Sequence, residues 1–137
     1  MGVVLRAAGA LLLLFPLAGA GVGAEGEGGL GRSLPGEAAR LRRMAIDQTK
    51  RGIDQMLELG GSLMTLWMGQ DGFDYSFQAD YARLWDKTLE ALAEVADHVP
   101  GCDISLEYKP NEPRSFSLMP DIGTTMLAIR EVGRANV

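Results

Sequence analysis

Glu107 and Lys109 lie two positions apart at the end of residues 103–109, a segment in which polar and apolar residues alternate. If this segment is a β-strand, Glu107 and Lys109 share one of its faces, because side chains alternate between the two faces of a sheet. Two charges that point into a protein interior are costly unless they pair or bind a cation or a substrate. Two interpretations stay open: a structural Glu–Lys pair or exposed edge face, and a binding site for a cation and a polar ligand.

An indole stands at the corresponding end of an earlier apolar run, residues 62–68. Thr65 and Trp67 alternate there with larger apolar side chains, as in a strand that is buried on both faces. In proteins with parallel strands, ligands bind at the carboxyl ends of the strands. Trp67 is therefore either a core residue or a wall of a ligand site shared with Glu107 and Lys109.

Helices are expected to position these two strands. The predicted helices, which show apolar residues at helical spacing and end at glycine or proline, span residues 37–59, 77–99 and 120–133. Strands separated by helices of this length predict right-handed crossovers and a parallel sheet, and hence an α/β fold. In the second strand, Ile104, Leu106 and Tyr108 are expected to face the helices. Residues 69–76 and 110–119 are predicted loops.

The first third of the chain is a different kind of sequence. Residues 1–24 contain no acidic residue, and an apolar run at residues 7–20 ends in small residues at 19–24. Within these, Val22, Gly23 and Ala24 resemble a small-x-small cleavage site. This run is short for a membrane span, which needs about 20 apolar residues, and it is typical of a secretory signal. The alternative is a Gly/Ala/Leu-rich segment that only mimics a signal. Residues 25–36 are glycine-rich and predict a linker, so the predicted domain spans residues 37–137.

Composition excludes several classes of function. The chain has 18 acidic against 13 basic residues and a net charge of −5, which argues against a nucleic-acid partner. A membrane is expected as a partner only through an uncleaved leader. Cys102 is the single cysteine, so an internal disulfide is excluded. His98 is the single histidine and ends a predicted helix, on the rim opposite the strand ends.

The two strand ends carry a resemblance to a known family. Residues 66–72 (LWMGQDG) and 106–114 (LEYKPNEPR) resemble the middle of xylose isomerase and its sugar-isomerase relatives, including the L-rhamnose isomerase type. Those proteins carry Trp-Gly-Gly-Arg-Glu-Gly after strand four and Glu-Pro-Lys-Pro-Asn-Glu-Pro-Arg after strand five. The second motif is long and specific. Tyr108 stands where xylose isomerase has proline, which leaves the sugar open.

The resemblance covers about residues 40–137 and implies an incomplete (β/α)8 TIM barrel of about two strands and three helices. It implies an aldose–ketose isomerase that acts on a small sugar by hydride shift with two divalent cations, Mg, Mn or Co. By resemblance, Glu107 is a metal ligand, a role that suits a hard carboxylate oxygen. Lys109 is the catalytic residue and binds the substrate oxygens, stabilising their negative charge. Trp67 forms an apolar wall of the sugar site.

Activity of this chain by itself is not expected, because the family takes further Asp, Glu and His metal ligands from later strands. The leading hypothesis is a partial sugar isomerase-like protein that is inactive alone. The alternatives are an exported, non-catalytic carbohydrate-binding module and a non-functional gene fragment. The family resemblance predicts a cytoplasmic location and homo-oligomers for full-length relatives, whereas a genuine leader predicts export.

Overall fold

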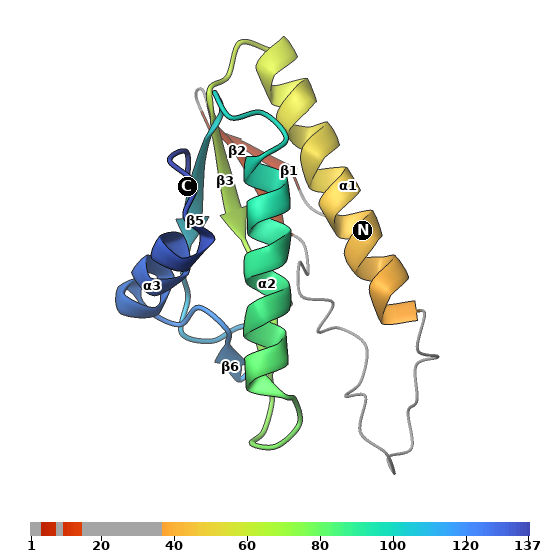
Figure 1. Ribbon diagram of the computed structural model, residues 1–137, viewed down its shortest axis with the longest axis vertical. Helices are drawn as coiled ribbons and strands as arrows, with labels where there is room; N and C mark the ends of the chain where they lie inside the picture. Colours follow the sequence, from red (N-terminus) through yellow and green to blue (C-terminus); the bar gives the residue numbers. More distant parts are fainter. Residues whose placement is uncertain (1–3, 8–9, 15–36) are drawn as a thin grey trace.

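A computed structural model of the chain describes residues 4–7, 10–14 and 37–137, with side chains from residue 38 onward (Figure 1). Within this part of the chain, each helix follows two strands. In chain order, the elements are β1 (Val4–Ala7), β2 (Ala10–Leu14), α1 (Glu37–Glu58), β3 (Leu63–Trp67), β4 (Gly72–Phe73), α2 (Tyr81–Ala96), β5 (Asp103–Glu107), β6 (Phe116–Ser117) and α3 (Ile122–Val132). No helix of the described residues is both long and apolar enough to span a membrane.

Side-chain caps and glycines set the ends of the helices. The Asp80 side chain accepts a hydrogen bond from the Arg83 backbone N–H at the start of α2, and Asp121 caps α3 in the same way through Thr124. Such caps satisfy amide groups that have no partner within the helix. Gly133 ends α3 in the left-handed region, at φ 63°, where glycine has no steric penalty. The three helices predicted from apolar spacing are thus confirmed.

The predicted start of the second helix, at residue 77, is wrong. Asp80 is in an extended conformation and caps the helix, so α2 begins at Tyr81. Phe77 lies before the helix with φ 66°, and its side chain is 94% exposed. The predicted apolar stripe therefore loses Phe77, and Tyr81 at the first turn is also exposed. The prediction began too early because aromatic residues of the loop before Asp80 happen to continue the helical spacing of the apolar residues.

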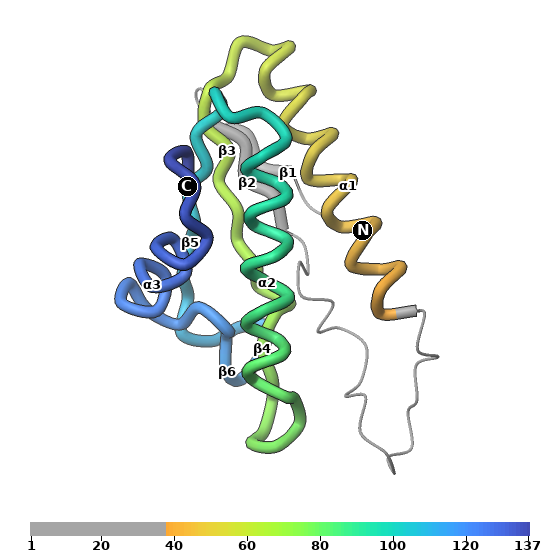
Figure 2. Tube along the Cα trace, in the orientation of Figure 1, coloured from red at the N-terminus to blue at the C-terminus, as the bar shows by residue number. Residues whose placement is uncertain are grey.

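The main sheet has the strand order β1-β2-β3-β5. β3 and β5 run parallel, with Met64 opposite Ile104 and Trp67 opposite Glu107. This pairing confirms the prediction of an α/β fold with parallel strands joined through a helix. The loops predicted after β3 and β5 contain the short strands β4 and β6, which pair antiparallel with each other (Figure 2).

Strands β1 and β2 fall in the predicted leader. They pair antiparallel, and β2 runs parallel to β3, with Leu14 opposite Trp67. The other residues of the predicted leader, and the predicted linker at residues 25–36, lie outside the described residues. Export of the chain through this segment stays a prediction.

The core lies between one face of the sheet and the helices. Leu66 and Ile104 on the sheet are buried in one cluster with Leu92 and Val95 of α2. The strands show alternating burial, so Trp67 and Glu107 belong to the opposite face. Tyr108 was expected to face the helices and does not: β5 ends at Glu107, the alternation ends with it, and the Tyr108 side chain is 46% exposed.

Residues after α3 return to the sheet at the free edge of β5. The Asp103 N–H points toward β3, where it donates to the Ser62 carbonyl. The Ile104 N–H therefore points to the other edge, where it donates to the Asn136 carbonyl at 2.7 Å. The Asn136 side chain donates to the carbonyl oxygens of Ala96 and Cys102. This residue thus ties the end of α2 and the start of β5 to the chain after α3.

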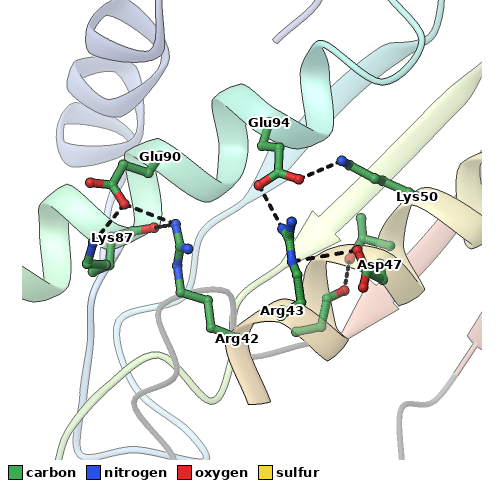
Figure 3. A network of polar contacts seen from close by, with 9 residues as sticks. Arg42, Arg43, Asp47, Lys50, Lys87, Glu90 and Glu94 are labelled. Atoms are coloured by element: carbon green, nitrogen blue, oxygen red, sulfur yellow. Dashed lines mark hydrogen bonds and ion pairs between the residues drawn. The ribbon is translucent and has the colours of Figure 1, made fainter. Parts of the chain in front are cut away.

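An ion-pair network joins α1 to α2 (Figure 3). Glu94 of α2 accepts hydrogen bonds from Arg43 at 2.7 Å and from Lys50 at 2.6 Å. One turn earlier, Glu90 pairs with Arg42 and Lys87. Glu90 and Glu94 therefore have two cationic partners each, at least one of them on α1. These pairs fix how α1 lies along α2, on the outer side of the core.

Replacing Glu94 by glutamine is expected to lower stability at neutral pH and to flatten its acid dependence. The hydrogen bonds from Arg43 and Lys50 lower the pKa of Glu94 to about 2. Since the folded pKa lies below the unfolded one, the stabilisation is present above about pH 4.5 and is lost as the pH falls toward 2. The carboxylate is about one-third exposed, so solvent screening limits the effect to about 1 kcal/mol.

Urea unfolding of wild type and Glu94→Gln between neutral and acid pH measures this effect. Glu58→Gln removes an exposed carboxylate from the end of α1 and is the matched control. If both variants lose the same stability at every pH, the Glu94 network contributes nothing specific to the α1–α2 contact.

Candidate functional site

The strand ends bring Trp67 and Glu107 together. β3 and β5 end at these two residues, which are direct partners in the parallel pairing. Both side chains belong to the sheet face away from the helices; the Trp67 side chain is partly buried and Glu107 is exposed. An apolar ring and a carboxylate thus lie next to each other at the carboxyl edge of the sheet, where α/β proteins bind their ligands.

Lys109 completes this group from beyond the end of β5. Its Nζ lies 5.1 Å from the centroid of the Trp67 ring, within the range of a cation–π interaction. The same Nζ forms an ion pair with the Glu112 carboxylate at 2.7 Å, and this bond lowers the pKa of Glu112. Among the described residues, Lys109 therefore pairs with Glu112 and not with Glu107. The first interpretation of the sequence is a structural Glu107–Lys109 pair or an exposed edge face. The pair is wrong, whereas the exposed position of Glu107 agrees with an exposed face.

Two further residues shape the site, and residue spacing alone did not identify either. Glu112 holds the Lys109 ammonium, although its side chain is 73% exposed. Gly69 lies against the flat side of the indole: a Cβ added there would be 2.7 Å from Cζ2 of Trp67. Only a residue without a side chain allows the backbone to approach the ring so closely. In the sequence, both could have been found only through the two segments that resemble sugar isomerases, since Gly69 lies in residues 66–72 and Glu112 in residues 106–114.

The described residues do not fit the two-metal site that the resemblance implies. Glu107 offers one carboxylate with free access to solvent. Glu112 and Asp74 are bound to Lys109 and Arg114. Nowhere in the described part of the chain do three or more His, Cys, Asp or Glu side chains lie together in a way that could hold a metal ion. A divalent cation at Glu107 stays a prediction.

The remaining titratable candidates lie elsewhere. His98 follows α2, and its Nε2 lies 2.8 Å from the Asp54 carboxylate of α1, as expected for a histidine at a helix end. Cys102 is buried before β5, and burial raises the pKa of its thiol. Asp121 caps α3, where its side chain accepts a hydrogen bond from the Thr124 backbone N–H.

No protein-family model matches the chain. The resemblance to sugar isomerases therefore stays a prediction, which depends on the two segments at the strand ends, residues 66–72 and 106–114. In the structure these segments bring Trp67, Glu107 and Lys109 to one edge of a parallel sheet.

Proposed function

We propose that the protein binds a small sugar on the face formed by Trp67, Glu107 and Lys109, hereafter the Trp67 face. The observation that carries this proposal is the Lys109 ammonium 5.1 Å from the Trp67 ring centroid, with Glu107 beside the indole in the sheet. In this proposal the chain is a partial sugar isomerase-like protein, and α1, β3, α2, β5 and α3 belong to an incomplete TIM barrel.

The chemistry of the Trp67 face suits a sugar. A pyranose or furanose ring has an apolar C–H face that packs on an indole, which is large and rigid. Its hydroxyl groups accept hydrogen bonds from an ammonium and donate them to a carboxylate. Lys109 and Glu107 supply one group of each kind, and hydrogen bonds to charged groups are about twice as strong as neutral ones. The Trp67 face thus offers the indole to the C–H face of a sugar and the two charged groups to its hydroxyls.

Isomerisation is the finer part of the proposal. Lys109 would stabilise negative charge on the substrate oxygen next to the migrating hydrogen, an electrostatic effect that is strong where water is excluded. A divalent cation at Glu107 would supply Lewis-acid activation of the substrate, but it would need further ligands that the described residues do not provide, so we assign no step to it. One accessible carboxylate does not complete such a site, so we propose that the described residues alone bind sugar without turnover.

A second candidate is a non-catalytic carbohydrate-binding module. The exposed Glu107 carboxylate on the Trp67 face favours it, because such a module needs the indole and the polar groups but no metal. The two candidates differ in metal dependence. A metal that binds the native state stabilises it, so Mg or Mn would raise the melting temperature of an isomerase-like site and leave a metal-free module unchanged.

Titration of a single-tryptophan protein tests the proposed function. Trp85→Phe leaves Trp67 as the only indole, and its emission is followed while D-xylose or L-rhamnose is added, in EDTA and in MgCl2. A saturable change in emission is expected with at least one sugar. Trp67→Phe is the control, because its remaining Trp85 is hydrogen-bonded to Glu131 of α3 and should not respond. Absence of a saturable change in both conditions contradicts the proposal.

A further inference from the structure

The loops that follow β3 and β5 are joined to each other. We name residues 68–80 the first loop and residues 108–121 the second loop. They pair as antiparallel strands at Gly72 and Phe73, where the Phe73 and Phe116 rings stack with centroids 5.1 Å apart. The Leu118 N–H extends this pairing by donating to the Asp71 carbonyl. The two strand ends that carry the Trp67 face are thus connected beyond the sheet itself.

Arg114 of the second loop closes this connection. Its Nη1 forms an ion pair with the Asp74 carboxylate at 3.0 Å, and its Nε donates to the Gln70 carbonyl at 3.4 Å. The second Asp74 oxygen accepts a hydrogen bond from the Ser115 backbone N–H at 3.1 Å. Both carboxylate oxygens and two guanidinium nitrogens are therefore engaged, a geometry that fixes orientation as well as distance. We name this ion pair, Asp74 and Arg114, the loop clamp.

The loop clamp is connected to Lys109 through the turn at Glu112. The Glu112 backbone N–H donates to the Arg114 carbonyl at 2.6 Å, and φ at Glu112 is 68°, a left-handed conformation that needs support from its surroundings. The Glu112 side chain in turn accepts from Lys109 at 2.7 Å. Lys109 is further held by its backbone N–H, which donates to the Met119 carbonyl. Contacts therefore run without a gap from Asp74 to the ammonium over Trp67.

We propose that Asp74 and Arg114 are positioning residues, which hold the second loop so that the Lys109 ammonium stays over the Trp67 ring. Trp67 is fixed by β3, whereas Lys109 lies past the end of β5, where the sheet no longer sets its position. Lysine has a long, flexible side chain and keeps one rotamer only when its surroundings hold it. The loop clamp supplies that constraint from the loop that follows Trp67. An effect of the loop clamp on ligand binding rests on the proposed function, whereas its effect on the position of Lys109 does not.

Ionic quenching of Trp67 fluorescence without sugar tests the positioning, in the Trp85→Phe protein. An ammonium next to the indole attracts iodide and repels caesium, so the ratio of their quenching constants reports its presence. Arg114→Met and Asp74→Asn are each expected to lower this ratio by about twofold, toward the value of Lys109→Met. The charge-swapped pair Asp74→Arg with Arg114→Asp should recover part of the loss. Acrylamide, which is neutral, detects any general change in exposure.

Arg134→Met is the matched control, because it removes another Arg–Asp pair, that with Asp97, and should leave the ratio unchanged. An unchanged ratio in Arg114→Met and Asp74→Asn, with a lowered ratio in Lys109→Met, overturns the loop clamp. An unchanged ratio in Lys109→Met overturns the placement of the ammonium itself. Sugar is absent from these measurements, so failure of sugar binding does not affect them. If sugar binds, its affinity should fall in Arg114→Met as in Lys109→Met.

Discussion

Leu92→Ala is expected to lower the free energy of unfolding by about 2–5 kcal/mol, the range for a fully buried leucine. Leu92 lies on α2 with no exposed surface, in the same cluster as Met64 and Leu66 of β3. Truncation removes apolar contacts with the sheet and leaves a cavity that a packed interior fills only in part. Urea unfolding of the full chain, followed by circular dichroism, measures the loss.

Leu127→Ala on α3 is the matched control for this prediction. The Leu127 side chain is about half exposed, so the same truncation should cost about 1 kcal/mol or less. Equal losses in the two variants would contradict a core formed between the sheet and α2. A large loss in Leu92→Ala alone supports the packing that holds β3 and β5 side by side, and with it the Trp67 face.

Lys109→Met is expected to weaken sugar binding by about ten- to one hundred-fold. The variant keeps most of the apolar stem of the side chain and removes the ammonium, which lies 5.1 Å from the Trp67 ring centroid. A hydrogen bond to a charged group contributes about 1.5–3 kcal/mol, which corresponds to that loss in affinity. The same Trp67 fluorescence titration in the Trp85→Phe background measures it.

Arg51→Met is the control for the loss of one positive charge, since Arg51 is an exposed residue of α1. Its sugar affinity should equal that of the parent protein. If Lys109→Met also keeps the parent affinity while sugar still changes Trp67 emission, the ligand lies on the indole without using the ammonium. The proposed role of Lys109 would then be wrong.

The regular elements could be predicted because local residue patterns determine them. Apolar spacing and the Gly60–Gly61 stop placed the first helix at residues 37–59, against Glu37–Glu58 in the structure. The apolar run at residues 62–68 and the alternating run at 103–109 correspond to β3 and β5. Each of these patterns is long enough for its period to be recognised.

The loops could not be predicted in the same way. The pairing of β4 with β6 involves two residues on each side, too few to show any periodicity. The Asp74–Arg114 pair depends on how the two loops fold over each other, and the Lys109–Glu112 pair depends on the turn within the second loop; the periodicity of the sequence encodes neither. The alternation that placed Lys109 beside Glu107 also assumed a strand that continues to residue 109, whereas β5 ends at Glu107. The sequence therefore predicted that Trp67, Glu107 and Lys109 lie at the strand ends, but it did not predict the ion pair of Lys109 with Glu112. A ligand site at this place stays a prediction.

Chemical-shift mapping with D-xylose and L-rhamnose on the 15N-labelled full chain tests the central claim most directly. The indole N–H of Trp67 and the backbone N–H of Lys109 are expected to shift together as either sugar saturates the protein. The indole N–H of Trp85, bound to Glu131, should stay in place. Saturable shifts confined to residues outside the Trp67 face, or no saturable shifts at all, would contradict sugar binding at the ends of β3 and β5.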